Sequence, residues 1–128
     1  MRSLVLLAAV GASLAGCAAT ATQPTLQPAV HPSPHESLVE AARSDAAGRS
    51  GLPAREMKLV ALESVTWPDG SLGCPRPGMG YTQALVPGYR IRLQVGREVW
   101  DYHASERGGL VLCPPGRAQE PVPGGGRS

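Results

Sequence analysis

The sequence predicts a small α+β domain, in which one N-terminal amphipathic helix packs on an antiparallel sheet of three to five strands. Three observations predict it: an apolar stripe at helical spacing, a later segment whose apolar residues pair as a hairpin, and two late cysteines placed to form one disulfide. The domain is expected over residues 36–116 of the 128. A domain of this size buries only about 60 to 65% of its unfolded surface, so a covalent staple is expected.

The first sixteen residues predict an export signal. Arg2 supplies one positive charge, an apolar run follows over residues 4–14, and the small residues Ala15 and Gly16 precede Cys17. Charge, apolar run and small-residue site are typical of a signal peptide, and the run is too short to span a membrane.

The tetrapeptide Leu14-Ala15-Gly16-Cys17 resembles the lipobox of bacterial lipoproteins. The resemblance implies cleavage before Cys17 and attachment of diacylglyceryl and a further acyl chain such as palmitate to that cysteine. It also implies a lipid-anchored place in the bacterial cell envelope. In a Gram-negative host this is the outer membrane, because Ala18 is not the aspartate that retains lipoproteins at the inner one. The alternative is an ordinary secretory signal in which Cys17 is incidental.

Residues 17–35 carry the predicted lipidated cysteine and a flexible tether, which has four prolines and no apolar periodicity. About 18 flexible residues span roughly 20 to 25 Å, and prolines extend that distance. At the other end of the chain, residues 117–128 are mostly Gly, Pro and Arg and predict a disordered tail.

A helix is expected to follow the tether. Ser33 can cap it, Pro34 suits its first turn, and Glu36 meets the positive end of the helix dipole. Gly48 and residues 51–53 are expected to end the helix after about 13 residues. Its apolar stripe comprises Leu38, Val39, Ala42 and Ala46.

Apolar and β-branched residues predict the strands. Residues 57–67 form the first, which ends in a turn over residues 67–70, because Pro and Asp-Gly interrupt strands. Residues 81–86 add another strand or lead into the next one. Residues 110–113 form the last strand, which Pro114-Pro115 ends.

The segment 89–103 predicts a hairpin around a two-residue turn at Gly96-Arg97. This register places apolar residues opposite one another on one face and a charge-matched pair on the other. A one-residue slip would destroy that sorting. The predicted pairs are Val95 with Glu98, Leu93 with Trp100, Ile91 with Tyr102, Arg92 with Asp101, and Arg90 with His103.

Cysteine usage is consistent with export. With Cys17 assigned to lipid, Cys74 and Cys113 remain, and in an oxidising compartment the simplest pairing is a disulfide. Closing a loop of about 40 residues would stabilise the domain by up to about 4 kcal/mol. The alternative is two free thiols, whereas a zinc site needs more ligands than two lone cysteines.

Composition excludes one class of partner and constrains the core. The net charge is +2 with no cluster of Lys and Arg, which argues against nucleic-acid binding. No Gly-rich phosphate loop or other cofactor motif is present. Because the chain lacks Phe, most of its aromatic residues are expected in the core; these are Trp67, Tyr81, Tyr89, Trp100 and Tyr102.

Residues 67–83, W-P-D-G-S-L-G-C-P-R-P-G-M-G-Y-T-Q, form the least common segment. Together with residues 88–93, Tyr102-His103 and Cys113, they resemble a small domain of unknown function found in many bacterial secreted proteins and lipoproteins. The resemblance supports one domain and implies no activity. The loop either closes one end of the sheet or is a rigid partner-binding surface that presents Asp69, Ser71, Leu72, Arg76 and Met79.

Catalysis and metal binding are not expected. Ser71, His103 and Asp69 or Asp101 are the residue types of a hydrolase, but no nucleophile motif surrounds the serine. His103 is expected on the strand surface near Arg90. His31, His35 and Glu36 are expected to be solvated tether residues, because the prolines between them prevent helical ligand spacing.

The leading hypothesis is therefore a non-enzymatic cell-envelope lipoprotein without cofactors, whose domain has an interaction or structural role. Its expected partners are the membrane, through lipid on Cys17, and another envelope protein. The alternative is a protease inhibitor that presents the braced loop around Arg76, because Pro77 makes the bond after this arginine a poor substrate.

Overall fold

The computed structural model describes residues 11–13, 15–22 and 28–125. These residues belong to two compact units, Met1–Val30 and His31–Ser128, and we call the second the folded unit. Much of the predicted signal peptide, Leu14 of the lipobox, residues 23–27 of the tether and residues 126–128 lie outside the described residues. Within the described ranges, no helix combines the length and apolarity needed to cross a membrane.

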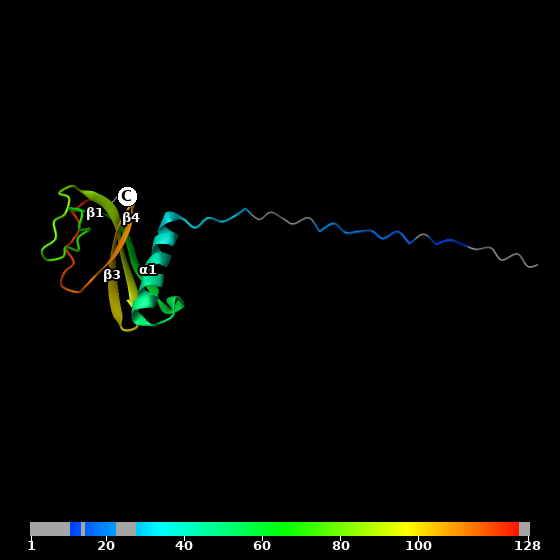
Figure 1. Cartoon of the computed structure of the whole chain (residues 1–128), viewed down its shortest axis with the longest axis horizontal. Helices are drawn as coiled ribbons and strands as arrows, with labels where there is room; N and C mark the ends of the chain where they lie inside the picture. Colours follow the sequence, from blue (N-terminus) through cyan, green and yellow to red (C-terminus); the bar gives the residue numbers. More distant parts are fainter. Residues whose placement is uncertain (1–10, 14, 23–27, 126–128) are drawn as a thin grey trace, which may run out of the picture. The chain divides into compact units, whose positions relative to one another are not determined.

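The folded unit has one helix on one face of a four-stranded antiparallel sheet, with the strands in the order β1-β2-β3-β4 (Figure 1). This confirms the predicted α+β class. The elements are α1 (Pro34–Ser50), the 3-10 turn η1 (Ala54–Glu56), β1 (Lys58–Trp67), β2 (Val86–Val95), β3 (Glu98–Ser105) and β4 (Gly108–Cys113).

Helix α1 begins where the sequence predicts. The Glu36 backbone N–H donates to Ser33 Oγ at 3.2 Å, and the Ser33 N–H donates back to Glu36 Oε2 at 2.7 Å. The hydrogen bond from the Ser33 backbone lowers the pKa of Glu36. The helix has 17 residues rather than about 13, because it continues through Gly48 and ends at Gly51.

The hairpin between β2 and β3 has the predicted register, with all five expected pairs. Gly96 has φ +60° and Arg97 has no positive φ, so the turn is of type II′, which matches the twist of the strands. Strand β2 is longer than expected and begins at Val86. Residues 81–85 form no strand and lead into it.

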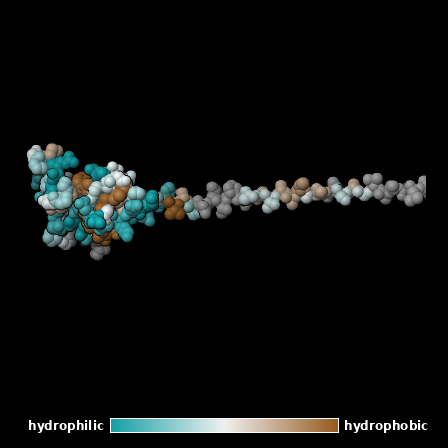
Figure 2. Space-filling view, turned by 90° about the horizontal axis from the view of Figure 1, so that it is seen from below, coloured by the Kyte–Doolittle hydropathy of each residue, from teal (hydrophilic) through white to brown (hydrophobic). Residues whose placement is uncertain are grey.

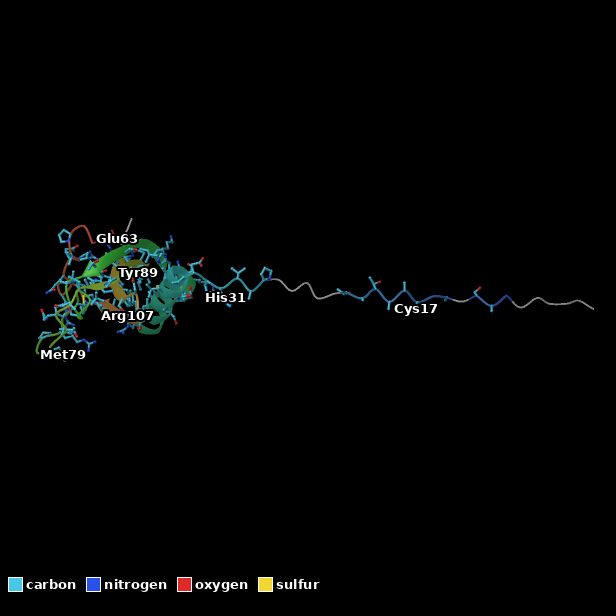
Figure 3. The ribbon with its side chains drawn as sticks, turned by 90° about the horizontal axis from the view of Figure 1, so that it is seen from above. Cys17, His31, Glu63, Met79, Tyr89 and Arg107 are labelled. Carbon is cyan, nitrogen blue, oxygen red and sulfur yellow. A yellow bond between two sulfur atoms is a disulfide. The ribbon has the colours of Figure 1, made fainter. Side chains whose placement is uncertain are left out.

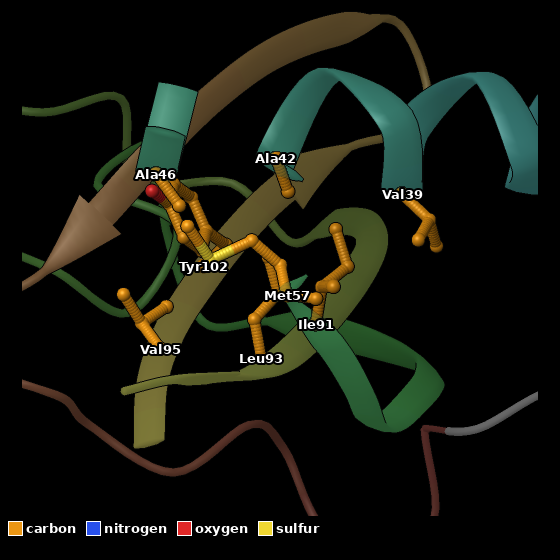
Figure 4. Packing of buried hydrophobic residues seen from close by; sticks show 8 residues of the cluster. All are labelled: Val39, Ala42, Ala46, Met57, Ile91, Leu93, Val95 and Tyr102. Carbon is orange, nitrogen blue, oxygen red and sulfur yellow. The ribbon is translucent and has the colours of Figure 1, made fainter. Parts of the chain in front are cut away.

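The core on the helix side consists of apolar side chains from α1, from Met57 and from β2 and β3 (Figure 4). The Tyr102 hydroxyl donates to Asp45 Oδ2 of the helix at 2.9 Å. Burial, followed by this hydrogen bond, raises the pKa of Tyr102. The residues of this core are Val39, Ala42, Ala46, Met57, Ile91, Leu93, Val95 and Tyr102.

The expectation that most aromatic residues lie in the core is wrong. Trp67 and Tyr102 are fully buried, whereas Tyr81, Tyr89 and Trp100 are only partly buried. Their positions explain the difference. Tyr81 lies in the loop after β1, the Tyr89 ring packs edge-on against the ring of His35, and Trp100 borders an open groove.

The predicted domain limits also need correction. The folded unit includes Pro34, and the described part of the supposed disordered tail, residues 117–125, packs against the domain. The Gln119 N–H donates to the Gly73 carbonyl and the Val122 N–H to the Thr66 carbonyl, each at 2.8 Å. The segment is held without regular secondary structure, because the backbone N–H groups of Gln119 and Val122 donate to a loop and to a strand edge.

Candidate functional site

The face of the sheet opposite α1 is covered by the loop between β1 and β2 and by the segment after β4. Side chains alternate along β3, so that Trp100 and Tyr102 lie on the helix side and Asp101 and His103 on the opposite side. This opposite side brings together most of the candidate residues. We call it the loop face.

His103 is the centre of the loop face. It is completely buried, and its ring stacks on Trp67 with centroids 4.2 Å apart. Its Nδ1 lies 2.6 Å from the Leu72 carbonyl oxygen, which can only accept, so Nδ1 carries a proton and donates. Its Nε2 lies 3.3 Å from Asp101 Oδ2. The expectation of a surface histidine is therefore wrong, because the loop covers this side of the strand.

Asp101 is held in its charged form. The Arg90 guanidinium donates to its two carboxylate oxygens, with an Nη2 to Oδ2 distance of 2.8 Å. Burial opposes ionisation, but hydrogen bonds and charge from His103 and Arg90 outweigh it and lower the pKa of Asp101 to about 2. Arg90 also pairs with Glu120 at 3.0 Å, which connects the C-terminal segment to the sheet.

The charge pairing between strands differs in detail from the prediction. Arg92 is directly opposite Asp101, as expected, but the Asp101 carboxylate pairs with Arg90 on the diagonal. Arg92 instead pairs with Glu63 of β1 at 2.9 Å. Diagonal neighbours lie within reach of long side chains, and the register alone does not choose between the two partners.

Ser71 and His103 do not form a nucleophile and a base. Ser71 is 4% exposed, and its Oγ has no hydrogen-bond partner among the residues that the structure describes. Both ring nitrogens of His103 face other atoms, the Leu72 carbonyl and the Asp101 carboxylate. A serine hydrolase needs the histidine free to accept the serine proton, and this arrangement does not leave it free.

Two of the five residues of the predicted partner-binding loop are turned inward. Asp69 Oδ1 accepts the Ser71 N–H at 2.8 Å, which starts a tight turn, and Leu72 follows with φ +57°. Ser71 and Leu72 are buried, so they are not presented to a partner as expected. Gly73 is required beside them, because a Cβ there would lie 2.6 Å from the ring of Trp67.

The outer part of the loop is exposed. Arg76 and Met79 close a turn, in which the Met79 N–H donates to the Arg76 carbonyl at 3.2 Å and Gly78 has φ +76°. The Tyr81 hydroxyl accepts the Arg76 N–H at 2.9 Å. Met79 is 60% exposed and lies at a tip of the folded unit (Figure 3). The tight turn after Arg76 is not an extended backbone, so the geometry adds no support to protease inhibition.

The predicted disulfide between Cys74 and Cys113 is present, with the two Cα atoms 5.6 Å apart. It joins the buried part of the loop to the end of β4. Cys17, in the other unit, is exposed and unpaired among the described residues.

A groove of about 680 Å³ lies where β4 ends. Figure 2, a view from below, shows hydrophilic and hydrophobic residues interspersed over the folded unit. We call this groove the notch. It is lined by Arg49, Glu98, Val99, Trp100, Asp101, Leu112, Cys113, Pro114, Pro115 and Ala118.

His35 and Glu36 are engaged away from any shared ligand site. The His35 ring contacts Tyr89 with centroids 5.1 Å apart, and the Glu36 carboxylate caps the helix through Ser33. In the part of the chain that the structure describes, no group of three or more His, Cys, Asp or Glu side chains is placed to hold a metal ion.

Sequence reasoning missed three features of the loop face and the notch. Glu120 was assigned to the tail, the Tyr81 hydroxyl was not expected to brace the loop, and the notch was not anticipated. Only the notch had a sequence signal. Pro114-Pro115 ends β4 early, which leaves residues 98–100 of β3 paired with β2 but not with β4.

One comparison with known proteins gives a match. A family model described as a domain of unknown function, DUF8738, matches residues 39–113, which is more than half of the chain. The match runs from Val39 in α1 to Cys113, the second disulfide cysteine. No curated protein and no solved structure matches the chain.

Proposed function

This chain belongs to the DUF8738 family, and we propose that it is a lipid-anchored lipoprotein of the bacterial cell envelope, whose folded unit is a non-enzymatic interaction module. The single observation that carries the proposal is that two of the three cysteines form a disulfide and the third, Cys17, does not take part in it. Cys74 and Cys113 are bonded to each other inside the folded unit, whereas Cys17 belongs to a separate unit, is exposed and forms no disulfide within the described part of the chain. It follows Ala15-Gly16 at the position where a lipobox requires its cysteine.

Lipid on Cys17 would anchor the protein firmly. A single acyl chain binds a membrane only marginally, and each further chain adds buried CH₂ groups at about 0.8 kcal/mol each. The segment between Cys17 and the helix would then be the tether, and a Gram-negative host would place the protein at its outer membrane. The disulfide also favours an oxidising compartment outside the cytoplasm.

An interaction role rests on how the folded unit uses its polar groups. His103, Asp101 and Arg90 bind one another and the loop, so they hold the fold together rather than facing a substrate. The features left open to a partner are the notch and the exposed loop tip at Arg76 and Met79.

The anchor is tested in a bacterial host that processes lipoproteins. Mass spectrometry of the purified protein is expected to find an N-terminal Cys17 carrying diacylglyceryl, and the protein is expected to leave membranes only with detergent. The matched variants are Cys17→Ser, which removes the proposed acceptor, and Ser13→Ala, which changes a neighbouring residue. We expect Cys17→Ser to abolish labelling by palmitate and Ser13→Ala to retain it. A mature N-terminus at another residue, or release by buffer alone, contradicts the proposal.

A further inference from the structure

The notch exists because β4 is shorter than the strand it pairs with. Pairing between β3 and β4 ends at Asp101 and Cys113, although β3 begins three residues earlier, at Glu98. Pro114 and Pro115 follow, and a proline has no N–H with which to continue the ladder. Residues 98–100 therefore have no strand paired with them on the β4 side within the described part of the chain.

The exposed edge of β3 offers hydrogen-bonding groups at Val99. In the two-residue hairpin, Val95 and Glu98 form a hydrogen-bonded pair, so alternate residues of β3 point their backbone groups to β2 and the others away from it. The Glu106 N–H donates to the Pro87 carbonyl at 3.0 Å. This agrees with the alternation, because Glu106 lies an even number of residues after Glu98 and also bonds toward β2. The N–H and C=O of Val99 thus face the notch, and no residue of the described chain pairs with them there.

The walls of the notch suit an extended chain. Trp100 and Leu112 lie on the helix side of the edge, and the Val99 side chain on the other side is 50% exposed. Arg49 and Glu98 add one charge of each sign at the border. Arg49 pairs with Asp45 at 2.6 Å but its side chain is 56% exposed, and the Glu98 carboxylate accepts from Trp100 Nε1 at 3.2 Å. Its volume of about 680 Å³ lies within the roughly 300 to 1,000 Å³ of typical ligand sites.

We propose that the notch binds an extended segment of a partner polypeptide, which adds to β3 as a short antiparallel or parallel strand through the backbone of Val99. The segment presents apolar side chains to Trp100 and Leu112 and carries flanking charges complementary to Arg49 and Glu98. Main-chain bonds supply affinity in this binding mode, and alternate side chains supply specificity. A second copy that paired through its own β3 could add only the same three residues, 98–100, because the same pair of prolines ends its β4. The proposal does not depend on lipid at Cys17.

The test uses the full-length protein as the cell processes it, purified in detergent, and a phage-displayed library of random heptapeptides. We expect selection of peptides with apolar residues at alternating positions, flanked by an acidic and a basic residue. On addition of a selected peptide, exchange of the Val99 amide hydrogen is expected to slow at least tenfold. This readout needs no variant and therefore does not depend on whether a substitution disturbs folding.

Two variants locate the site. Val99→Pro removes the N–H and Val99→Lys keeps it but fills the notch; each is expected to weaken peptide binding at least tenfold. The matched control is Val60→Pro in β1, the opposite edge strand. Val60 is 52% exposed and lies at the register shift of β1, outside the residue pairs between β1 and β2. Because β1 is at the other end of the sheet from the notch, binding is expected to stay unchanged.

Three results overturn the proposal. The library gives no selected peptide; selected peptides bind without slowing exchange at Val99; or the protein alone forms a dimer that protects the Val99 amide, which would assign the edge to a second copy. Failure of the anchoring test at Cys17 leaves each of these outcomes unaffected, so the two proposals fail separately.

Discussion

The two faces of the sheet are closed by different kinds of interaction. On the helix side, Val39 and Ala42 of α1 pack against alternating apolar residues of β2 such as Ile91 and Leu93. On the loop face, the cover has no regular secondary structure, and a stacked Trp67–His103 pair, an ion pair and a disulfide hold it in place.

The difference follows from what each cover can supply. A helix presents a periodic apolar stripe and satisfies its own backbone hydrogen bonds, so apolar burial holds it with few individual polar contacts, such as the one from Tyr102 to Asp45. A loop rich in Gly and Pro has neither property, and its buried backbone groups need individual partners. The Leu72 carbonyl receives such a partner in His103, and the Gly73 carbonyl receives one in Gln119. The loop face therefore depends on more individual polar contacts than the helix side, and we expect the loss of one such contact to loosen it locally.

The largest expected effect is that of Trp67→Ala. Removing a fully buried Trp costs about 3 to 5 kcal/mol, comparable to about 2 to 5 kcal/mol for Leu93→Ala on the helix side. The two variants should differ in which backbone amides exchange faster. We expect Trp67→Ala to speed exchange of the Gly70 and Gln119 amides, which the loop face protects, far more than that of the α1 amides. Equal acceleration on both faces would contradict the comparison. Urea unfolding and amide exchange provide the measurements.

Removal of the disulfide is expected to have the next effect. The double variant Cys74→Ala/Cys113→Ala should lose up to about 4 kcal/mol of unfolding free energy, because the bond closes a loop with a sequence separation of 39. Reductant should lower the urea midpoint of the native protein and leave that of the double variant unchanged. A native protein that is insensitive to reductant after unfolding would contradict the assigned role of the bond.

Acid is expected to have the smallest effect. The pKa of Asp101 is lowered to about 2 in the folded protein from an ordinary 3.8, so its contribution to stability is present above about pH 4 and is lost as the pH falls through 2. We expect about 1 to 2 kcal/mol, reduced from the full linkage value because the carboxyl is partly exposed.

The comparison for this prediction is Asp101→Asn. The pKa values of Asp45 and Glu36 on the helix side are also lowered, so the native protein loses stability in acid for several reasons. The difference between native and variant unfolding free energies, measured from pH 6 to pH 2, isolates Asp101. If this difference does not change with pH, the loop-face ion pair contributes nothing to stability.

The sequence by itself determined the local features of the fold. The start of the helix follows from Ser33 and Glu36, the hairpin register from the sorting of side chains around Gly96-Arg97, and the disulfide from the only two cysteines after Cys17. Each depends on short-range backbone chemistry, on a period of two or on counting, and each was predictable for that reason.

Tertiary structure alone decided which residues the loop buries. The inward turn of Ser71 and Leu72, the burial of His103 and the packing of residues 117–125 all depend on contacts between distant segments without periodicity. The notch is an intermediate case, because Pro114-Pro115 marks the end of β4 in the sequence, whereas the strand that is left unpaired there is determined by the pairing of β3 with β4. A pattern in sequence shows which side of a strand is apolar, whereas only the folded chain determines what covers the other side.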